Sequence, residues 1–352
     1  MKHLCTTLKK SFQGKNLKLF TLSNDNNVEV KITNYGATIT SIRTPDNEGN
    51  FDEIVLGFDN PEEYLTDFYI NNCPYFGAIA GRYANRIAKG QLNIEGKTYQ
   101  LATNNLGNAL HGGIKGFDKQ FWDGNLIAGE NYVGVELTYL SPHLEEGYPG
   151  NLFVKVIYIL NNKNELEIQF NATTDEATAL NLTNHTYFNL SGCQSPVTDH
   201  YLIINSNRMI EVDNLIPTGQ IIDISGTDYD FSQEKLIGLD IDKLPIGYDI
   251  GYAIDAEPNK VKSAAYLKDK NSGRTLEILT SEPSIQLYTG YFIPDVKGHK
   301  GNKYGKYMGV ALETQHYPDS PNHPNFPDTQ LQPGDTFSSK TIFRFGTLTK
   351  QQ

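Results

Sequence analysis

Cysteine is scarce in this sequence, with only Cys5, Cys73 and Cys193 among 352 residues. The number is odd and no pair has the Cys-x-x-Cys spacing, which argues against a disulfide framework and against a structural zinc site. We interpret all three as reduced thiols, the state expected in the cytoplasm.

Positive charge is also in short supply. The 30 Lys and Arg residues face 41 Asp and Glu, so the formal net charge is −11. The longest basic run is Lys9-Lys10, whereas a nucleic-acid surface needs clustered cations for its phosphate contacts. The composition therefore argues against a nucleic-acid partner.

Long apolar runs are missing as well. No stretch approaches the roughly 18 to 20 apolar residues that span a bilayer. Residues 1–15, MKHLCTTLKKSFQGK, lack the apolar core of a secretory signal. We therefore expect no membrane partner and a cytoplasmic location.

What the sequence does contain is an ordinary globular composition with a strong β pattern. Hydrophobic residues make up 38% and charged residues 20%, enough to bury a sizeable core. Short runs of alternating apolar and polar residues, rich in Val, Ile, Tyr, Phe and Thr, are separated by Gly, Asn, Asp and Pro. The predicted strands are 92–94, 97–101, 133–140, 154–160, 166–170, 201–205, 275–280 and 285–288.

This spacing predicts an all-β fold, a large antiparallel β-sandwich with few short helices. The best helix candidate is Pro61 to Phe68, where Pro in the first turn is followed by Glu62 and Glu63. Without a Pro/Ser-rich linker to cut at, we expect residues 1–352 to form a single domain.

Two glycine-rich segments carry ionisable groups. Arg82 and Arg86 lie in GRYANRI, residues 81–87, and His111 lies in NALHGG, residues 108–113. Glycines beside such side chains let a ligand approach the backbone closely. The plainer interpretation is that the arginines are ion-paired and that Gly112-Gly113 is a turn.

A third polar segment, residues 181–190, contains His185. On a strand, His185 would share a face with Thr183 and Tyr187, near aromatic rings and partly shielded from water. Histidine titrates near neutrality, so it can donate or accept a proton. A hydrogen-bonded histidine within a sheet is the alternative.

Glu313 follows the apolar run 309–312, so it lies on a strand that should be buried. A carboxylate there must find partners, and burial and charged neighbours shift its pKa, as a general base requires. A structural ion pair is the alternative. Asp249, after Gly247-Tyr248, is a further candidate. A His and a Glu facing each other among hydrogen-bonding groups and aromatic rings are typical of a sugar site.

The motifs, taken in order, resemble those of the aldose 1-epimerase (galactose mutarotase) family over nearly the whole chain. They are NYGA at 34–37, VLGF at 55–58, GR at 81–82, ANRI at 84–87, LHGG at 110–113, GFD at 116–118, Trp122, TNH at 183–185, YFNL at 187–190, GYD at 247–249, QLYTG at 286–290, LETQ at 312–315 and YPD at 317–319.

The resemblance implies a sandwich of the galactose mutarotase type, with a cleft for a free hexose and no cofactor. We expect no metal either, since no HxH or HxxxE-type ligand cluster lies on the key strands. It implies that His185 is the general acid and Glu313 the general base. The residues it implies for binding the sugar are Arg82, His111, Asp249, Asn85, Gln286 and Tyr288. The chain departs from the family at Ile250, where His is common, and at Tyr291, where Asn is common.

The implied reaction is anomer exchange of D-galactose or D-glucose through ring opening and re-closure, with Glu313 deprotonated and His185 protonated. Three alternatives stay open at this point. A glycoside hydrolase needs two carboxylates, for which Asp249 could partner Glu313. A hexose-phosphate mutarotase needs extra cations, and a carbohydrate-binding protein needs no His185 opposite Glu313. The chain could be a monomer or a homodimer.

Overall fold

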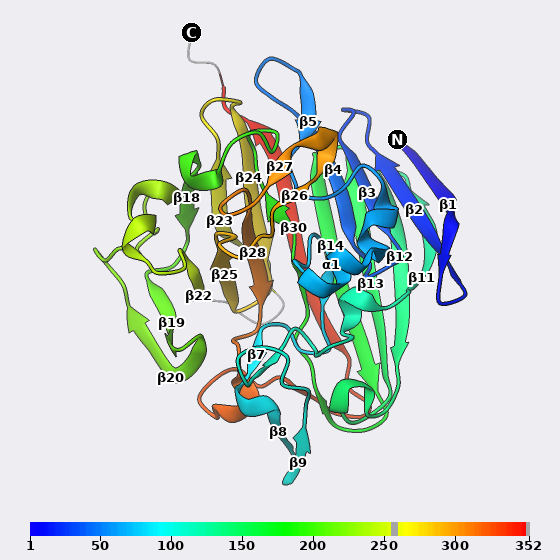
Figure 1. Cartoon of the computed structure of the whole chain (residues 1–352), viewed down its shortest axis with the longest axis vertical. Helices are drawn as coiled ribbons and strands as arrows, with labels where there is room; N and C mark the ends of the chain where they lie inside the picture. The colour runs from blue at the N-terminus through cyan, green and yellow to red at the C-terminus, as the bar shows by residue number, and fades with distance from the viewer. Residues whose placement is uncertain (255–259, 350–352) are drawn as a thin grey trace.

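The computed structural model describes residues 1–254 and 260–349, and three antiparallel sheets form its framework (Figure 1). The nine-stranded sheet has the order β11 (Asp123–Gly129), β12 (Tyr132–Ser141), β13 (Leu152–Asn161), β14 (Glu165–Thr174), β30 (Phe337–Thr347), β24 (Arg274–Thr280), β23 (Lys262–Lys268), β18 (Tyr201–Ile204) and β21 (Lys235–Leu236).

Two smaller sheets complete the sandwich. The five-stranded sheet comprises β1 (Lys2–Phe12), β2 (Lys15–Ser23), β3 (Glu29–Thr33), β4 (Ile39–Pro45) and β5 (Phe51–Glu53). The six-stranded sheet has the order β17 (Tyr187–Phe188), β28 (Val310–Gln315), β25 (Ser284–Tyr288), β22 (Asp249–Ala253), β19 (Arg208–Asp213) and β20 (Ile216–Asp223).

Short paired strands and helices connect the sheets. The pairs are β10 (Ala109–Leu110) with β7 (Arg86–Ile87), β16 (Thr183–Asn184) with β6 (Ile79–Ala80), β15 (Thr178–Ala179) with β29 (Gln330–Leu331), β26 (Val296–Lys297) with β27 (Lys303–Tyr304), and β8 (Gln91–Ile94) with β9 (Lys97–Gln100). The helices are α1 (Asp67–Asn72) and the 3₁₀ turns η1 (Pro61–Leu65), η2 (Ala88–Gly90), η3 (Phe117–Lys119), η4 (Glu145–Gly147), η5 (Val197–Asp199), η6 (Ile237–Leu239), η7 (Ile241–Lys243), η8 (His299–Gly301) and η9 (Ser320–Asn322).

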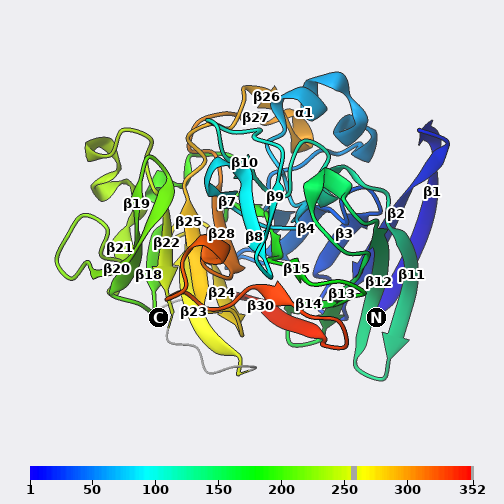
Figure 2. The ribbon, with the colours of Figure 1, turned by 90° about the horizontal axis from the view of Figure 1, so that it is seen from below.

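The two smaller sheets lie on one face of the nine-stranded sheet. In Figure 2 the central strands β24, β30 and β14 form the lower layer, with β28 and β4 above them and α1 at the top. The layers are joined by a hydrogen bond between the hydroxyls of Thr314 and Thr341, 2.6 Å apart, and by one from the Tyr158 hydroxyl to the Ala37 carbonyl.

Alternation along the strands places the core between these layers. Every second residue of β13 is buried, and the buried set joins one apolar cluster with side chains from β3, β25 and β28. Each strand therefore buries one face, as the alternating sequence pattern predicts, and the predicted antiparallel β-sandwich is confirmed. Both predicted hairpins, β8 with β9 and β13 with β14, are also present.

The predicted helix from Pro61 to Phe68 is wrong in its extent. The chain forms η1 and then α1, separated by Thr66 in an extended conformation. The Thr66 hydroxyl donates to the Glu63 carbonyl and accepts from the Tyr69 amide, so this one residue ends the first turn and caps the next helix.

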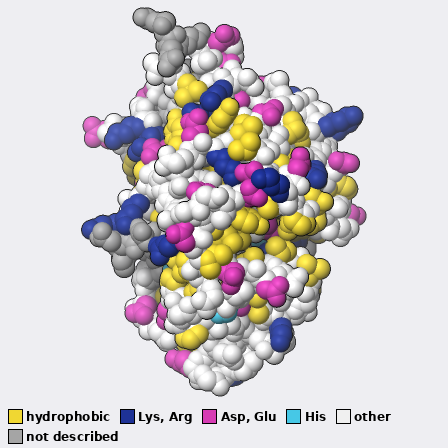
Figure 3. Space-filling model, turned by 90° about the vertical axis from the view of Figure 1, so that its left-hand side faces the viewer, with side chains coloured by type: hydrophobic (Ala, Val, Ile, Leu, Met, Phe, Trp, Pro, Cys, Tyr) yellow, Lys and Arg dark blue, Asp and Glu magenta, His cyan; other side chains and the backbone are white. Residues whose placement is uncertain are grey.

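The surface carries both signs of charge. On the face that Figure 3 shows, acidic and basic side chains are interspersed, and hydrophobic side chains gather near the middle. Among the residues that the structure describes, no helix is long and apolar enough to cross a membrane. That the chain forms one domain stays a prediction.

Candidate active site

The floor of the site is the outward face of the six-stranded sheet. Gln286 of β25 pairs with Glu313 of β28, and Tyr288 pairs with Asp249 of β22, so all four side chains share one face. Their neighbours Leu312, Leu287 and Ile250 belong to the apolar core on the other face. The period of two along each strand thus separates the polar site from the core.

His185 lies in a gap between two short strands, which differs from the continuous strand considered for residues 181–190. Thr183 pairs with Ala80, whereas Tyr187 pairs with Ala311 of β28. The chain therefore changes partner at His185, whose amide donates to the Ala78 carbonyl. This crossing brings the imidazole over the floor, beside Glu313.

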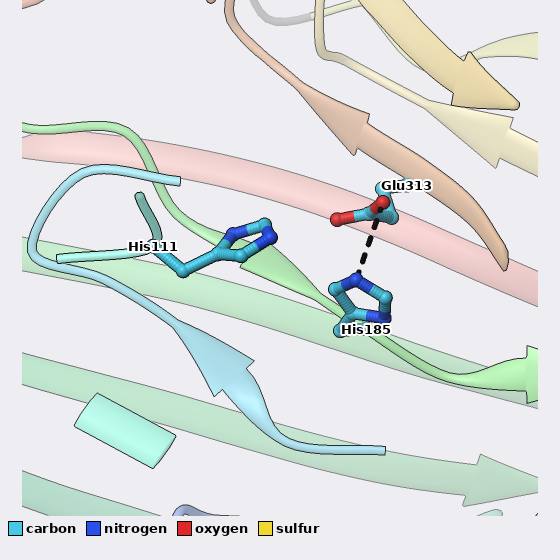
Figure 4. A group of neighbouring side chains, drawn as sticks. All are labelled: His111, His185 and Glu313. Carbon is cyan, nitrogen blue, oxygen red and sulfur yellow. Dashed lines mark ion pairs between the residues drawn. The ribbon is translucent and has the colours of Figure 1, made fainter. Parts of the chain in front are cut away.

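A cavity of about 220 Å³ opens above this floor. Its lining includes six of the eight residues predicted from the sequence, namely Asn85, His111, His185, Asp249, Tyr288 and Glu313. At its base the His185 Nε2 and a Glu313 carboxylate oxygen are 3.6 Å apart, and both side chains are almost completely buried. Figure 4 shows His111 and His185 converging on Glu313.

The other two predicted residues do not line the cavity. Gln286 lies beneath it and donates a hydrogen bond of 2.6 Å to the Asp249 carboxylate, so it acts on that carboxylate instead of facing the cavity. Arg82, predicted to bind the sugar, lies outside the cavity lining. Its guanidinium is buried and donates to the carbonyls of Pro149 and Gly150 and to the Ser141 hydroxyl.

The arginine that does line the cavity is Arg86. Its guanidinium lies 3.8 Å from the Asp249 carboxylate, and its Nε donates to the Asn105 side chain. Asn85, with a φ of 63°, reverses the chain between the two arginines and turns them in different directions. The sequence analysis named both arginines but selected Arg82, and not Arg86, as the sugar-binding one.

Aromatic rings complete the walls, and sequence reasoning did not single out most of them. Tyr75, Tyr187 and Phe292 all line the cavity, in addition to Tyr288. Tyr187 is the ring that the sequence analysis placed on the same face as His185, two residues further along the chain. Tyr75 and Phe292 lie in loops, for which the sequence offers no comparable signal.

Burial sets the protonation of the central pair. Burial and the nearby Asp249 carboxylate, partly offset by Arg86, raise the pKa of Glu313 to about 8. Burial lowers the pKa of His185 to about 4. These shifts place the shared proton on Glu313, which is the reverse of the charged pair expected from the sequence.

The attraction between the two groups offsets this preference. Moving a proton from a group of pKa about 8 to one of pKa about 4 costs about 5 kcal/mol. Opposite unit charges 3.6 Å apart attract by about 5 kcal/mol at an effective dielectric constant of about 20. The attraction between the opposite charges therefore offsets much of the preference for the neutral pair.

His111 is held as a neutral hydrogen-bond donor. Its Nδ1 accepts from the Asn85 amide at 3.2 Å, so the hydrogen of the neutral ring sits on Nε2. Burial, the neighbouring His185 and the cations Arg86 and Lys119 hold its pKa well below the usual value. His111 can therefore donate to a ligand oxygen.

His111, His185 and Glu313 are also the residues that could hold a metal ion, since their ligand atoms lie within 4.8 Å of one another. A metal needs a free lone pair on the imidazole nitrogen. The lone pair of His111 Nδ1 already accepts from Asn85, and Nε2 carries the hydrogen. This hydrogen bond would have to break before His111 could coordinate a metal.

Known proteins resemble this chain along nearly its whole length. The family model described as aldose 1-epimerase matches residues 18–344. The galactose mutarotase of Bos taurus is 41% identical over 330 residues, 93% of each chain. That of Homo sapiens is 40% identical over 336 residues, 94% of this chain and 95% of the relative. The solved structure of an aldose epimerase homologue from C. elegans is 30% identical, has a TM-score of 0.85, and covers 94% of this chain and 99% of that one.

The chain belongs to the aldose 1-epimerase family. It is accordingly an isomerase that acts on carbohydrates.

Proposed function

We propose that this protein interconverts the α and β anomers of free aldohexoses, with D-galactose and D-glucose as substrates. The observation that carries the proposal is the buried pair of His185 and Glu313, 3.6 Å apart at the base of a polar cavity. The names of the Bos taurus and Homo sapiens relatives, galactose mutarotase, support D-galactose.

In the proposed reaction the Glu313 carboxylate removes the proton of the C1 hydroxyl while the His185 imidazolium protonates the ring oxygen O5. The C1–O5 bond breaks and leaves an open-chain aldehyde. Rotation about C1–C2 presents the other face of the carbonyl, and O5 attacks it with the two proton transfers reversed. Ring closure gives the other anomer and restores both groups, so no net oxidant, reductant or water is needed.

The remaining lining residues orient the sugar in this proposal. Arg86, Asn85 and the Nε2–H of His111 offer donors, and Asp249 offers an acceptor for sugar hydroxyls. Asp249 is itself fixed by Gln286 and faced by Arg86, so its lone pairs are preorganised.

The charges favour an unphosphorylated sugar. Of the described residues that line the cavity, Arg86 is the only lysine or arginine, and it faces Asp249. A phosphate needs additional cations or amide donors. We therefore place free hexoses ahead of hexose phosphates. A cytoplasmic location, and a monomer or homodimer, remain parts of this proposal.

Polarimetry tests the proposal. Freshly dissolved α-D-galactose and α-D-glucose should reach their equilibrium rotation faster with the protein than without it. Galactose 6-phosphate and methyl α-galactoside, which cannot open its ring, serve as comparisons. If only galactose 6-phosphate equilibrates faster, the hexose-phosphate mutarotase is favoured. Release of methanol from the methyl galactoside would favour a hydrolase, and sugar binding without faster equilibration would favour a carbohydrate-binding protein.

A further inference from the structure

The imidazole of His185 is not held by hydrogen bonds of its own ring. Among the described residues its Nδ1 has no hydrogen-bond partner, although the side chain is buried. Its Nε2 is 3.6 Å from the Glu313 carboxylate, longer than an ordinary hydrogen bond. A proton donor needs a fixed direction, so packing must supply what hydrogen bonding does not.

Two tyrosine rings provide that packing. The ring of Tyr75 is stacked on His185, with centroids 5.6 Å apart and planes 23° apart. The ring of Tyr187 lies 4.8 Å away on centroids, tilted by 39°. Tyr187 is fixed by its place on β17 and by an edge contact with Phe76. Tyr75 comes from the loop between α1 and β6, and it also contacts the ring of His111, at 4.7 Å.

The loop holds Tyr75 in a strained backbone conformation. Its φ is 58°, a left-handed conformation that is rare for an aromatic residue and costs about 1 kcal/mol or more. The Tyr75 carbonyl accepts from the Ala78 amide. The Lys119 ammonium lies 5.5 Å from the ring centroid and is bound by Asp118 and Cys73. These contacts determine where the ring lies.

We propose that Tyr75 is a positioning residue whose ring, stacked on His185 and in contact with His111, keeps the His185 imidazole directed at Glu313 and at the sugar in the cavity. The inference rests on the proposed anomer exchange and extends it. The ring makes these contacts, so a phenylalanine should replace the tyrosine and an aliphatic side chain should not.

The test compares Tyr75→Phe, Tyr75→Leu and Tyr75→Met with the wild type on D-galactose. We expect Tyr75→Phe to keep kcat within about twofold. We expect the Leu and Met variants to lower kcat by about tenfold or more, with KM within about threefold, because a misdirected donor slows the reaction more than it weakens binding. Met nearly retains side-chain length, so the test does not depend on the Leu variant folding.

Tyr64→Leu is the matched control. Tyr64 is a buried aromatic residue in the same apolar cluster as Tyr187, outside the cavity. Its loss should lower Tm without lowering kcat in the protein that remains folded. Recording Tm for every variant separates lost packing from misplaced chemistry.

Three results would overturn the inference. An aliphatic variant with near-normal kcat would show that His185 does not need the stacked Tyr75 ring to hold its direction. Raised KM with unchanged kcat would make Tyr75 a sugar contact. A Phe variant as slow as the Leu variant would assign the role to the hydroxyl. If the wild type itself fails to speed equilibration, the proposed function has failed first.

Discussion

Replacing Glu313 by glutamine should stabilise the protein, by an amount that grows with pH. The pKa of the carboxyl is about 8 in the folded chain and about 4.5 when unfolded. Between these values the folded state binds a proton that the unfolded state has released, so stability falls as pH rises. The linkage is about 1.36 kcal/mol for each pH unit, or about 3 kcal/mol accumulated between pH 4.5 and 7.

Glu313→Gln removes this loss because its amide does not titrate. At pH 4.5 the variant and the wild type should have the same stability, and at pH 7 the variant should be about 3 kcal/mol more stable. For 352 residues the unfolding entropy makes 1 kcal/mol worth about 1.4 °C, so Tm should rise by about 4 °C. The contribution of the lowered His185 pKa to stability is present in both proteins, so it cancels in the stability difference between variant and wild type.

Thermal unfolding followed by circular dichroism from pH 4.5 to 8 measures this difference. Glu165→Gln is a control of opposite sign, because Asn161 and Arg344 hydrogen-bond its carboxylate and lower its pKa. A Tm difference for Glu313→Gln that does not change with pH, or a variant less stable at pH 7, would refute the reasoning that Glu313 is a buried, destabilising acid.

The remaining predictions concern activity and metal content. The pH profile of kcat/KM should be flat between about pH 4 and about pH 8. Below this window the His185–Glu313 pair gains a second proton and lacks a base, and above it the pair loses its one proton and lacks an acid. Rates that stay constant from pH 3 to 10 would contradict this prediction. Arg86→Met should lower kcat/KM by about tenfold or more with little change in Tm. Arg82→Met should leave kcat/KM nearly unchanged and lower stability by about 3 kcal/mol, because it leaves buried carbonyls without donors. If the two variants lowered kcat/KM equally, the placement of Arg86 in the site and Arg82 outside it would be contradicted. Dialysis against EDTA should leave the rate unchanged, because His111 has no free lone pair; a rate restored only by a divalent ion would show the opposite.

The sandwich was predictable because its signal is local. Alternation in β13 and β14 marks a buried face on each strand, and the short polar break between them marks a hairpin. The register of the six-stranded sheet was not predictable, since it depends on segments from residue 187 to residue 315 meeting in space. That register is what places Asp249 and Glu313 on one face.

The site shows the same division. Glu313 could be chosen from the sequence because it follows the apolar run 309–312, and His185 because it is the ionisable group of the polar segment 181–190. That Arg82 turns away from the cavity could not be predicted, because its acceptors lie near residues 141 and 150, far along the chain, and nothing near Arg82 indicates them. The protonation of the central pair also escaped prediction, because it depends on how completely the sheet and loops exclude water.

The most direct test of the central claim is the rate of α–β exchange of ¹³C1-labelled D-galactose at equilibrium, measured by NMR exchange spectroscopy. Wild type, Glu313→Gln, His185→Asn and the double variant are compared. Each single variant should lose at least about 10² in exchange rate, and the double variant should lose little more, because the two groups act as a unit. Wild-type exchange in either single variant would contradict the account.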